Sequence, residues 1–536
     1  MPTTPLSAFP GNWEPDAHMP ATDPAQLARA LSDPSLSLIF VPTPEGPGLA
    51  IGGRVGATDR GYPISAILRA CPAQSLGDPA FRRAHGLEYA YVTGAMANGI
   101  ASAEIVEAMA RAGMLGFFGA AGLSQPRVEE NIRRIQRNIP DLPYGFNLIH
   151  SPNEPAHELA IAELYLKYRV TRVEASAYLD LTLPIVLYRL SGIREEADGR
   201  IVVPNRVMGK ISRVEVATRF LSPAPEKYVA ELVRMGRLTA EQAEMAKRVP
   251  MADDLTCEAD SGGHTDNRPA IALLPTIVAL RDRLQTKFRY AQPVRVGLGG
   301  GIATPASAAG AFAMGAAYVV TGSINQACVE SGSSDIVREM LSQAEQADVA
   351  MAPAADMFEM GVKVQVLKRG TMFPQRAMKL YEAYRAYSSA EAIPTAEREI
   401  IEKTILRRSI EEVWVETREF FSRRDPSQIA RAEADPRHKL ALVFRWYLGL
   451  SSRWANGGDA TRRLDYQVWC GPSMGAFNEW TKGTFLAAPA RRQVVAVAKS
   501  LMRGAAVVLR EFSLRQQGVW LPSDLFHTAP IEEIAD

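Results

Sequence analysis

The chain has 536 residues, of which 47% are hydrophobic and 22% are charged, and its formal net charge is +1. This length exceeds one ordinary core, so we expect a barrel of about 250 residues with additional structure around it. The near-zero charge excludes a broad field that would attract nucleic acid. The four cysteines are far apart and form no C-x-x-C pair, which argues against disulfide scaffolds and thiolate metal sites.

Residues 1–85 are rich in proline and glycine. Short apolar runs at 37–41 and 49–51 flank a Pro/Gly-rich turn, which predicts a small N-terminal segment containing β-structure. The sequence begins without the basic region and apolar run of a signal peptide, and no later segment offers about 18 uninterrupted apolar residues. We therefore expect a cytoplasmic protein that does not cross a membrane.

From residue 86 short apolar strands alternate with helical stretches, which is typical of repeated βα units. Eight candidate strands begin near residues 89, 115, 144, 172, 206, 254, 294 and 317. Eight units favour closure into an α/β fold of the (β/α)8 TIM barrel type over residues 86–345. Ser102 and Thr304 are predicted to cap two of its helices.

Two further regions interrupt or follow this alternation. A helical insertion at about 223–250 is expected to form a hairpin over the mouth of the barrel, between the fifth and sixth strands. After residue 345 charged helical runs take over, and 346–536 is predicted to be a separate C-terminal helical region. It holds six of the seven tryptophans, which indicates a packed body rather than a solvated tail.

Two glycine loops follow the seventh and eighth predicted strands, at 299–301 and 322–323. In TIM barrels these loops commonly bind phosphate, because backbone N–H groups and a helix N-terminus converge there. Tight turns without a ligand are the alternative. A Rossmann fingerprint is excluded, since Ile302 or Thr304 stands where its last glycine is required. The residues predicted to contact phosphate are Gly300, Gly301, Gly322 and Ser323.

Other positions at the same end of the barrel suit a flat ring such as a flavin. The segment 93–97 closes the first strand, and its small residues would let the ring lie against the backbone. Asn147, near the end of the third strand, can bond a ring edge or instead satisfy a loop. Lys210, near the end of the fifth strand, can place positive charge near a reduced ring or its phosphate, or form a surface salt bridge.

The sixth predicted strand runs into EADSGGH at 258–264, which puts His264 on a glycine loop at the catalytic end of the barrel. Imidazole can donate a proton or a hydrogen bond near neutral pH, and the adjacent glycines let substrate approach the backbone. A purely structural loop histidine is the alternative. His150, after the third strand, is a second candidate, and no His/Glu cluster has metal-ligand spacing.

Three segments together, at 94–122, 258–264 and 297–323, resemble the nitronate monooxygenase superfamily. A closer similarity is carried by FNLIHSPNEP (146–155), ADSGGHTDNRP (259–269), VTGSINQA (320–327) and WCGPSMGAFNEW (469–480). These resemble the PfaD family, over residues 30 to 525. The chain has Asp260–Ser261 where simpler relatives have a shorter Ala-Gly-Gly-His form.

The PfaD resemblance implies an enoyl reductase that acts in trans on a polyketide or polyunsaturated fatty acid synthase. It implies FMN as cofactor, NADPH as reductant with NADH as an alternative, and an enoyl thioester on an acyl carrier protein as substrate. A homodimer is possible. It also makes His264 the catalytic histidine. The cofactor contacts that it implies are Gly94, Ala95, Met96, Asn147, Gly300, Gly301, Gly322 and Ser323, to which we add Lys210, Ser261 and Gly262.

A basic run at 361–380 is a candidate landing site for an acidic carrier protein, with a solvated face as the alternative. It comprises Lys363, Lys368, Arg369, Arg376 and Lys379. Two other functions stay open. A nitronate monooxygenase would use the same barrel, FMN and histidine without nicotinamide, and a scaffold would bind synthase modules without catalysis.

Overall fold

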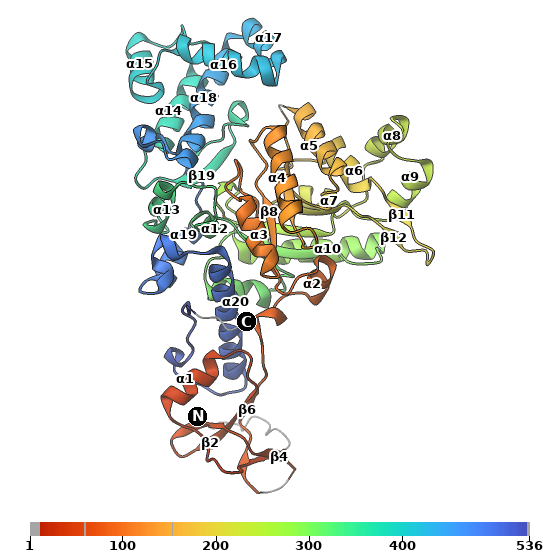
Figure 1. Ribbon diagram of the computed structural model, residues 1–536, viewed down its shortest axis with the longest axis vertical. Coiled ribbons are helices and arrows are strands. Elements are labelled where there is room, and N and C mark those ends of the chain that lie inside the picture. The colour runs from red at the N-terminus through yellow and green to blue at the C-terminus, as the bar shows by residue number, and fades with distance from the viewer. Residues whose placement is uncertain (1–10, 58–59, 153, 533–536) are drawn as a thin grey trace.

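Eight parallel strands close into a barrel in the computed structural model, which describes residues 11–57, 60–152 and 154–532 (Figure 1). All eight predicted strands are confirmed. They are buried runs, because in a TIM barrel helices cover the outer face of the sheet and side chains fill the inner one. In chain order they are β7 (Tyr91–Thr93), β8 (Leu115–Phe118), β9 (Gly145–Ile149), β10 (Arg172–Ser176), β13 (Arg206–Ile211), β14 (Asp254–Glu258), β16 (Arg295–Gly299) and β17 (Val319–Thr321).

Helices follow these strands and begin where the capping residues predict. The Oγ of Ser102 accepts a hydrogen bond from the N–H of Ile105 at 3.1 Å, and Thr304 forms a capping box with Ser307. The helices around the barrel are α3 (Ala103–Arg111), α4 (Gln125–Asn138), α5 (Pro155–Lys167), α6 (Leu183–Leu190), α7 (Val214–Phe220), α10 (Ala270–Phe288), α11 (Pro305–Ala313), α12 (Ser323–Gln326) and α13 (Asp335–Ser342).

The N-terminal segment contains the predicted β-structure, in two small sheets. Its strands pair antiparallel through Thr43 and Gly46, so the connecting turn is tighter than the sequence indicates. Residues 1–10, and with them the predicted absence of a signal peptide, lie outside the described residues. The elements are β1 (Asn12–Glu14), α1 (Pro24–Ser32), β2 (Leu38–Thr43), β3 (Gly46–Ala50), β4 (Arg54–Gly56), β5 (Tyr62–Pro63), β6 (Ala66–Leu68) and α2 (Pro79–His85).

The insertion forms the predicted helical hairpin, α8 (Glu226–Arg234) and α9 (Ala240–Ala246), but the expectation that it covers the barrel mouth is wrong. Helix α8 packs on α6, and the hydroxyl of Tyr228 donates to the carbonyl of Leu181 at 3.0 Å. The apolar stripe of α8 is buried on this outer flank of the barrel (Figure 1). No residue of 223–250 lines the cavity at the mouth.

The region after residue 345 begins with two strands that the sequence did not predict. β18 (Val349–Pro353) and β19 (Lys363–Leu367) form a sheet with β15 (Gly263–His264), which belongs to the histidine loop. A helical body follows at one end of the molecule in Figure 1, with its own buried core. Its helices are α14 (Phe373–Ala386), α15 (Thr395–Ile400), α16 (Ile410–Arg424), α17 (Pro426–Ala434) and α18 (Pro436–Gly457).

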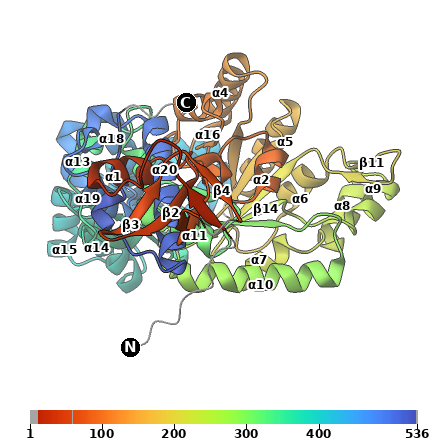
Figure 2. The same ribbon diagram turned by 90° about the horizontal axis from the view of Figure 1, so that it is seen from below.

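The last two helices return to the barrel instead of extending this body. α19 (Ser473–Thr481) packs on α12, and α20 (Val494–Gln516) packs on α11 and α3 and contacts β6 of the N-terminal segment (Figures 1 and 2). Their buried apolar residues up to Ala506 share the barrel's hydrophobic core, whereas Val507 and Leu514 of α20 pack with the N-terminal segment. The sequence boundaries at 85 and 345 stay predictions. Over the described ranges, no helix is both long and apolar enough to span a bilayer.

Candidate active site

A cavity of about 610 Å³ opens at the carboxyl ends of the barrel strands. Its inner wall comes from the barrel loops and its outer wall from α16 and α18. Every residue that the sequence singled out for the site lines this one cavity. These are Gly94, Ala95, Met96, Asn147, Lys210, Ser261, Gly262, His264, Gly300, Gly301, Gly322 and Ser323, together with the second-rank candidate His150.

The two glycine loops form an open cradle on the cavity wall. Gly300 and Gly301 have φ of +83° and +76°, a left-handed conformation that favours glycine. A Cβ at Gly300 would lie 2.6 Å from the carbonyl oxygen of Ala259, whereas a Cβ at Gly301 or Gly322 would meet no described atom within 4 Å. The space beside Gly301 and Gly322 therefore fits a ligand group, and its backbone surroundings suit a phosphate.

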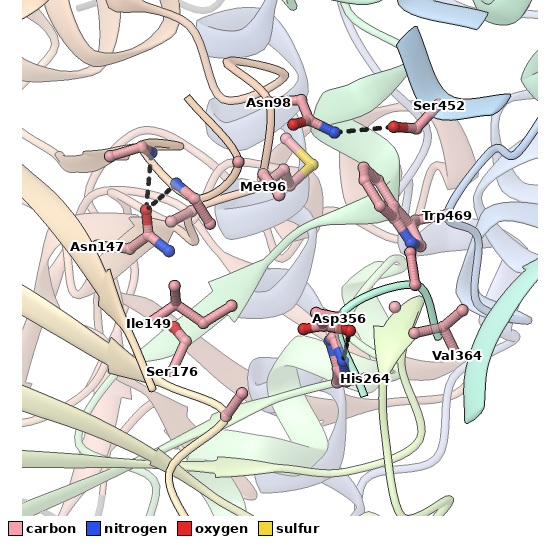
Figure 3. Close-up of a pocket in the computed structure, with 18 of the residues that line it drawn as sticks. Met96, Asn98, Asn147, Ile149, Ser176, His264, Asp356, Val364, Ser452 and Trp469 are labelled. Atoms are coloured by element: carbon pink, nitrogen blue, oxygen red, sulfur yellow. Dashed lines mark hydrogen bonds and ion pairs between the residues drawn. The ribbon is translucent and has the colours of Figure 1, made fainter. Parts of the chain in front are cut away.

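Asn147 satisfies a loop, which is one of the two roles that the sequence left open. Its Oδ1 accepts hydrogen bonds from the N–H groups of Ala120 and Ala121, at 2.7 and 3.2 Å, and so holds the loop after β8. Asn147 also lines the cavity, as Met96 does (Figure 3). A residue fixed in this way presents its Nδ2 donor in one orientation, as recognition of a ring edge requires.

A buried charge cluster lies beneath the segment Gly94–Met96. The Nζ of Lys210 is 2.8 Å from Glu258, and both side chains are more than four-fifths buried, so Lys210 is not a surface salt bridge. Burial opposes its charge, but Glu258 and Glu174 hold the pKa of Lys210 above its usual value. Glu174 accepts a hydrogen bond from the N–H of Ala95 at 2.9 Å. Its other carboxyl oxygen is buried without a partner among the described residues.

His264 is paired with Asp356, a residue that the sequence reasoning missed. Its Nε2 lies 3.2 Å from Oδ1 of Asp356, and Figure 3 shows the two side chains together at the cavity wall. Burial opposes the charged imidazole, but the neighbouring carboxylate outweighs it and raises the pKa of His264. The pair can therefore hold a proton at the cavity near neutral pH.

The loop around His264 is held by a C-terminal segment, residues 469–471. A Cβ at Gly262 would lie 2.9 Å from the backbone nitrogen of Cys470, so this glycine serves chain packing. The N–H of Gly471 donates to Oγ of Ser323 at 3.1 Å and so joins the histidine loop to the glycine cradle. The Oγ of Ser261, at the cavity wall, is buried without a hydrogen-bond partner in the described part of the chain. An unpartnered donor there fits a bound polar group.

The predicted basic run does not form a continuous cationic surface. Arg376 pairs with the buried Asp465, and Arg369 pairs with Asp348 at 3.0 Å. The side chains of Lys363 and Lys368 are exposed. Only part of the run is therefore available to an acidic partner.

Two family models match the chain. The nitronate monooxygenase model matches residues 82–403, which include the whole barrel. The model of the inserted helical domain of acyl-carrier-protein S-malonyltransferase matches residues 387–466, which include α16 and α18.

Two known proteins are similar over most of the chain. A polyunsaturated fatty acid synthase polypeptide of Thraustochytrium sp. is 49% identical over 85% of the chain and 31% of its own length. Polyketide biosynthesis protein PksE of Bacillus subtilis is 44% identical over 84% of the chain and 58% of its own length. The chain thus spans about a third and about three-fifths of these relatives.

A solved structure covers the same region and is matched over its whole length. The crystal structure of the enoyl reductase domain of MlnA, from the macrolactin biosynthesis cluster of Bacillus amyloliquefaciens, is 40% identical with a TM-score of 0.79. It covers 83% of this chain and 100% of that domain. Together with the barrel, the histidine loop and the glycine cradle, these likenesses show that the chain belongs to the nitronate monooxygenase family and, within it, to the PfaD-like enoyl reductases.

Proposed function

We propose that the chain is an FMN-dependent enoyl reductase that uses NAD(P)H, with NADPH as the expected donor. Its substrate is the 2,3 double bond of an enoyl thioester on an acyl carrier protein, in polyketide or polyunsaturated fatty acid biosynthesis. The observation that carries this is one cavity that joins an open glycine cradle to a hydrogen-bonded His264–Asp356 pair. The similarity to the MlnA enoyl reductase domain supports it.

The residues present fit FMN. Gly301, Gly322 and Ser323 would hold the phosphate, while the backbone of Gly94–Met96 and the amide of Asn147 would hold the ring. Bound FMN supplies the hydride chemistry, from the nicotinamide to the β-carbon of the thioester. Lys210 would hold positive charge close to the ring, since its pairing with Glu258 keeps it protonated.

His264 would act on the thioester itself. Asp356 raises the pKa of the His264 imidazole and so favours its protonated form, which can donate to the α-carbon or to the thioester carbonyl. The hydroxyl of Ser261, which has no partner among the described residues, lies in the same loop and can donate to the carbonyl as negative charge develops there.

Replacing His264 by alanine tests this role. We expect kcat for a crotonyl thioester to fall about 100-fold or more, in the range usual for loss of a general acid. Retention of the flavin spectrum would show that the variant keeps its cofactor. Unchanged turnover would remove His264 from the mechanism.

A nitronate monooxygenase is the second candidate, because the family model over residues 82–403 carries that description. It would consume oxygen with an alkyl nitronate and need no NADPH. Oxygen uptake under those conditions, without thioester reduction, would favour this function. A colourless protein that gains no flavin spectrum with added FMN would favour the scaffold.

A further inference from the structure

The cavity extends beyond the barrel into a passage along α16 and α18. The cavity-lining residues of these helices recur at helical spacing, so one face of each helix is turned to the passage. We define the passage by Phe420, Phe421, Leu442, Trp446, Gly449 and Arg453.

Direct contacts hold both helices to the barrel loops. Asn98 donates to Oγ of Ser452 at 2.8 Å, as Figure 3 shows, and Arg424 makes two-pronged contact with Glu154, at 3.0 and 2.7 Å. These contacts join the outer wall of the passage to the barrel loops.

Gly449 lines the passage and leaves open space beside α18. Gly449 lies in the interior of α18, where glycine costs roughly 1 kcal/mol relative to alanine. A Cβ at this position would meet no described atom within 4 Å. Packing within the described chain therefore does not require glycine here, and any side chain would project into open space at the cavity.

Within the described residues, the side chain of Arg453 forms no ion pair and no hydrogen bond. The two other arginines of α16 and α18 that line the cavity are both held. Arg424 pairs with Glu154, and Arg445 donates to the carbonyl of Ala355 at 2.8 Å. Arg453 is exposed while lining the cavity, so it lies where the cavity meets solvent.

We propose that this passage binds the 4′-phosphopantetheine arm of the thioester substrate, with Arg453 pairing with its phosphate. The inference rests on the proposed function and names how its substrate is held. The arm is a slender chain with two amides and a geminal dimethyl group, which suits aromatic and aliphatic walls, and it ends in an anion that a guanidinium binds well. The match of residues 387–466 to the helical domain of an acyl-carrier-protein transferase supports the assignment.

The test compares crotonyl thioesters of pantetheine and 4′-phosphopantetheine in wild-type and Arg453→Ala protein. We expect kcat/KM for the phosphorylated thioester to fall about tenfold, as loss of one charge-assisted contact predicts, and kcat/KM for pantetheine to stay unchanged. Arg463→Ala is the matched control, because Arg463 is exposed but does not line the cavity. Equal losses for both thioesters, or none for either, would overturn the role of Arg453.

Gly449→Leu tests the passage independently of charge. Leucine improves helix propensity, so the variant should fold at least as well as wild type, which thermal unfolding checks. We expect it to reduce the short N-acetylcysteamine thioester at the wild-type rate and to lose about tenfold in kcat/KM for pantetheine thioesters. Wild-type activity on both thioesters would contradict binding of the arm in the passage.

Two further experiments identify the carrier of the phosphopantetheine arm and separate its binding from catalysis. Crotonyl-CoA and crotonyl acyl carrier protein both contain the phosphopantetheine arm. A lower KM for the carrier-bound substrate would show that the passage serves a carrier protein. A lower KM for crotonyl-CoA would contradict a carrier protein as the source of the arm. Calorimetric binding of 4′-phosphopantetheine needs no turnover. Binding that Arg453→Ala weakens, in a protein that reduces no thioester, would retain the passage and refute the enoyl reductase, whereas absence of binding to wild type would refute the passage.

Discussion

At the scale of single residues, the His264–Asp356 pair predicts a pH dependence. Asp356 raises the pKa of His264, so a reaction that needs the protonated imidazole loses rate as pH rises through this raised pKa. Asp356→Asn removes the carboxylate, and we expect the falling limb of kcat/KM against pH to move to lower pH. An NMR titration of the His264 ring should show the same shift. A falling limb that does not move would show that Asp356 does not affect the ionisation that controls the rate.

Glu174 predicts a pH effect on the stability of the fold, which originates mainly in burial rather than in a neighbouring charge. Burial raises its pKa from 4.5 to about 7, although Lys210 and the N–H of Ala95 favour the charged form. The folded chain therefore binds this proton more tightly than the unfolded chain. Its contribution to stability is fully present below about pH 4.5 and is lost, by up to about 3 kcal/mol, as pH rises through about 7.

Glu174→Gln removes this titration and keeps an oxygen that can accept from Ala95. Wild type loses stability as Glu174 ionises, whereas the variant does not. We therefore expect the unfolding free energy of the variant minus that of wild type to increase by up to about 3 kcal/mol from about pH 5 to about pH 8. Urea unfolding at the two pH values measures this difference. The same difference at both would show that Glu174 does not titrate in this range.

At the scale of elements, a glycine in α20 allows this helix to pack closely against α11. A Cβ at Gly504 would lie 2.5 Å from Cγ of Pro305, at the start of α11, whereas a Cβ at Gly310, within α11, would meet no described atom within 4 Å. We expect Gly504→Ala to destabilise the fold by about 1–3 kcal/mol through overpacking. Gly310→Ala, the matched control, should gain up to about 1 kcal/mol from helix propensity. Equal effects in thermal unfolding would contradict this packing.

The barrel strands could be predicted because each is a short apolar run between helical stretches, and local composition alone carries that signal. The placement of α8 could not, because its stripe at Val229 and Leu232 indicates a buried face without naming the partner. The sheet of β15, β18 and β19 was missed for a related reason. Its strand β15 is only Gly263–His264, and its partner lies about a hundred residues later in the chain.

The same limit applied to the site. Glycine loops and His264 could be predicted from their place after strands, since parallel strands bring their carboxyl ends together. Asp356 could not, because 92 residues separate it from His264 and no motif links them. Glu174 carried a usable signal, a carboxylate between the apolar residues Val173 and Ala175 in the middle of a predicted strand.

At the scale of the whole molecule, segments far apart in sequence enclose one cavity. The barrel provides the cradle and His264, residues 469–471 hold both loops, and α16 and α18 form the outer wall. The sequence predicted a separate helical region, whereas α20 shares the barrel's core and also contacts the N-terminal segment. The cavity is thus a product of the complete fold and not of the barrel alone.

The absorbance spectrum of the purified protein under anaerobic conditions tests the central claim most directly. We expect a flavin spectrum that NADPH bleaches and that a crotonyl thioester restores without oxygen. A spectrum that NADPH leaves unchanged, or that only oxygen restores after bleaching, would contradict an NADPH-dependent enoyl reductase.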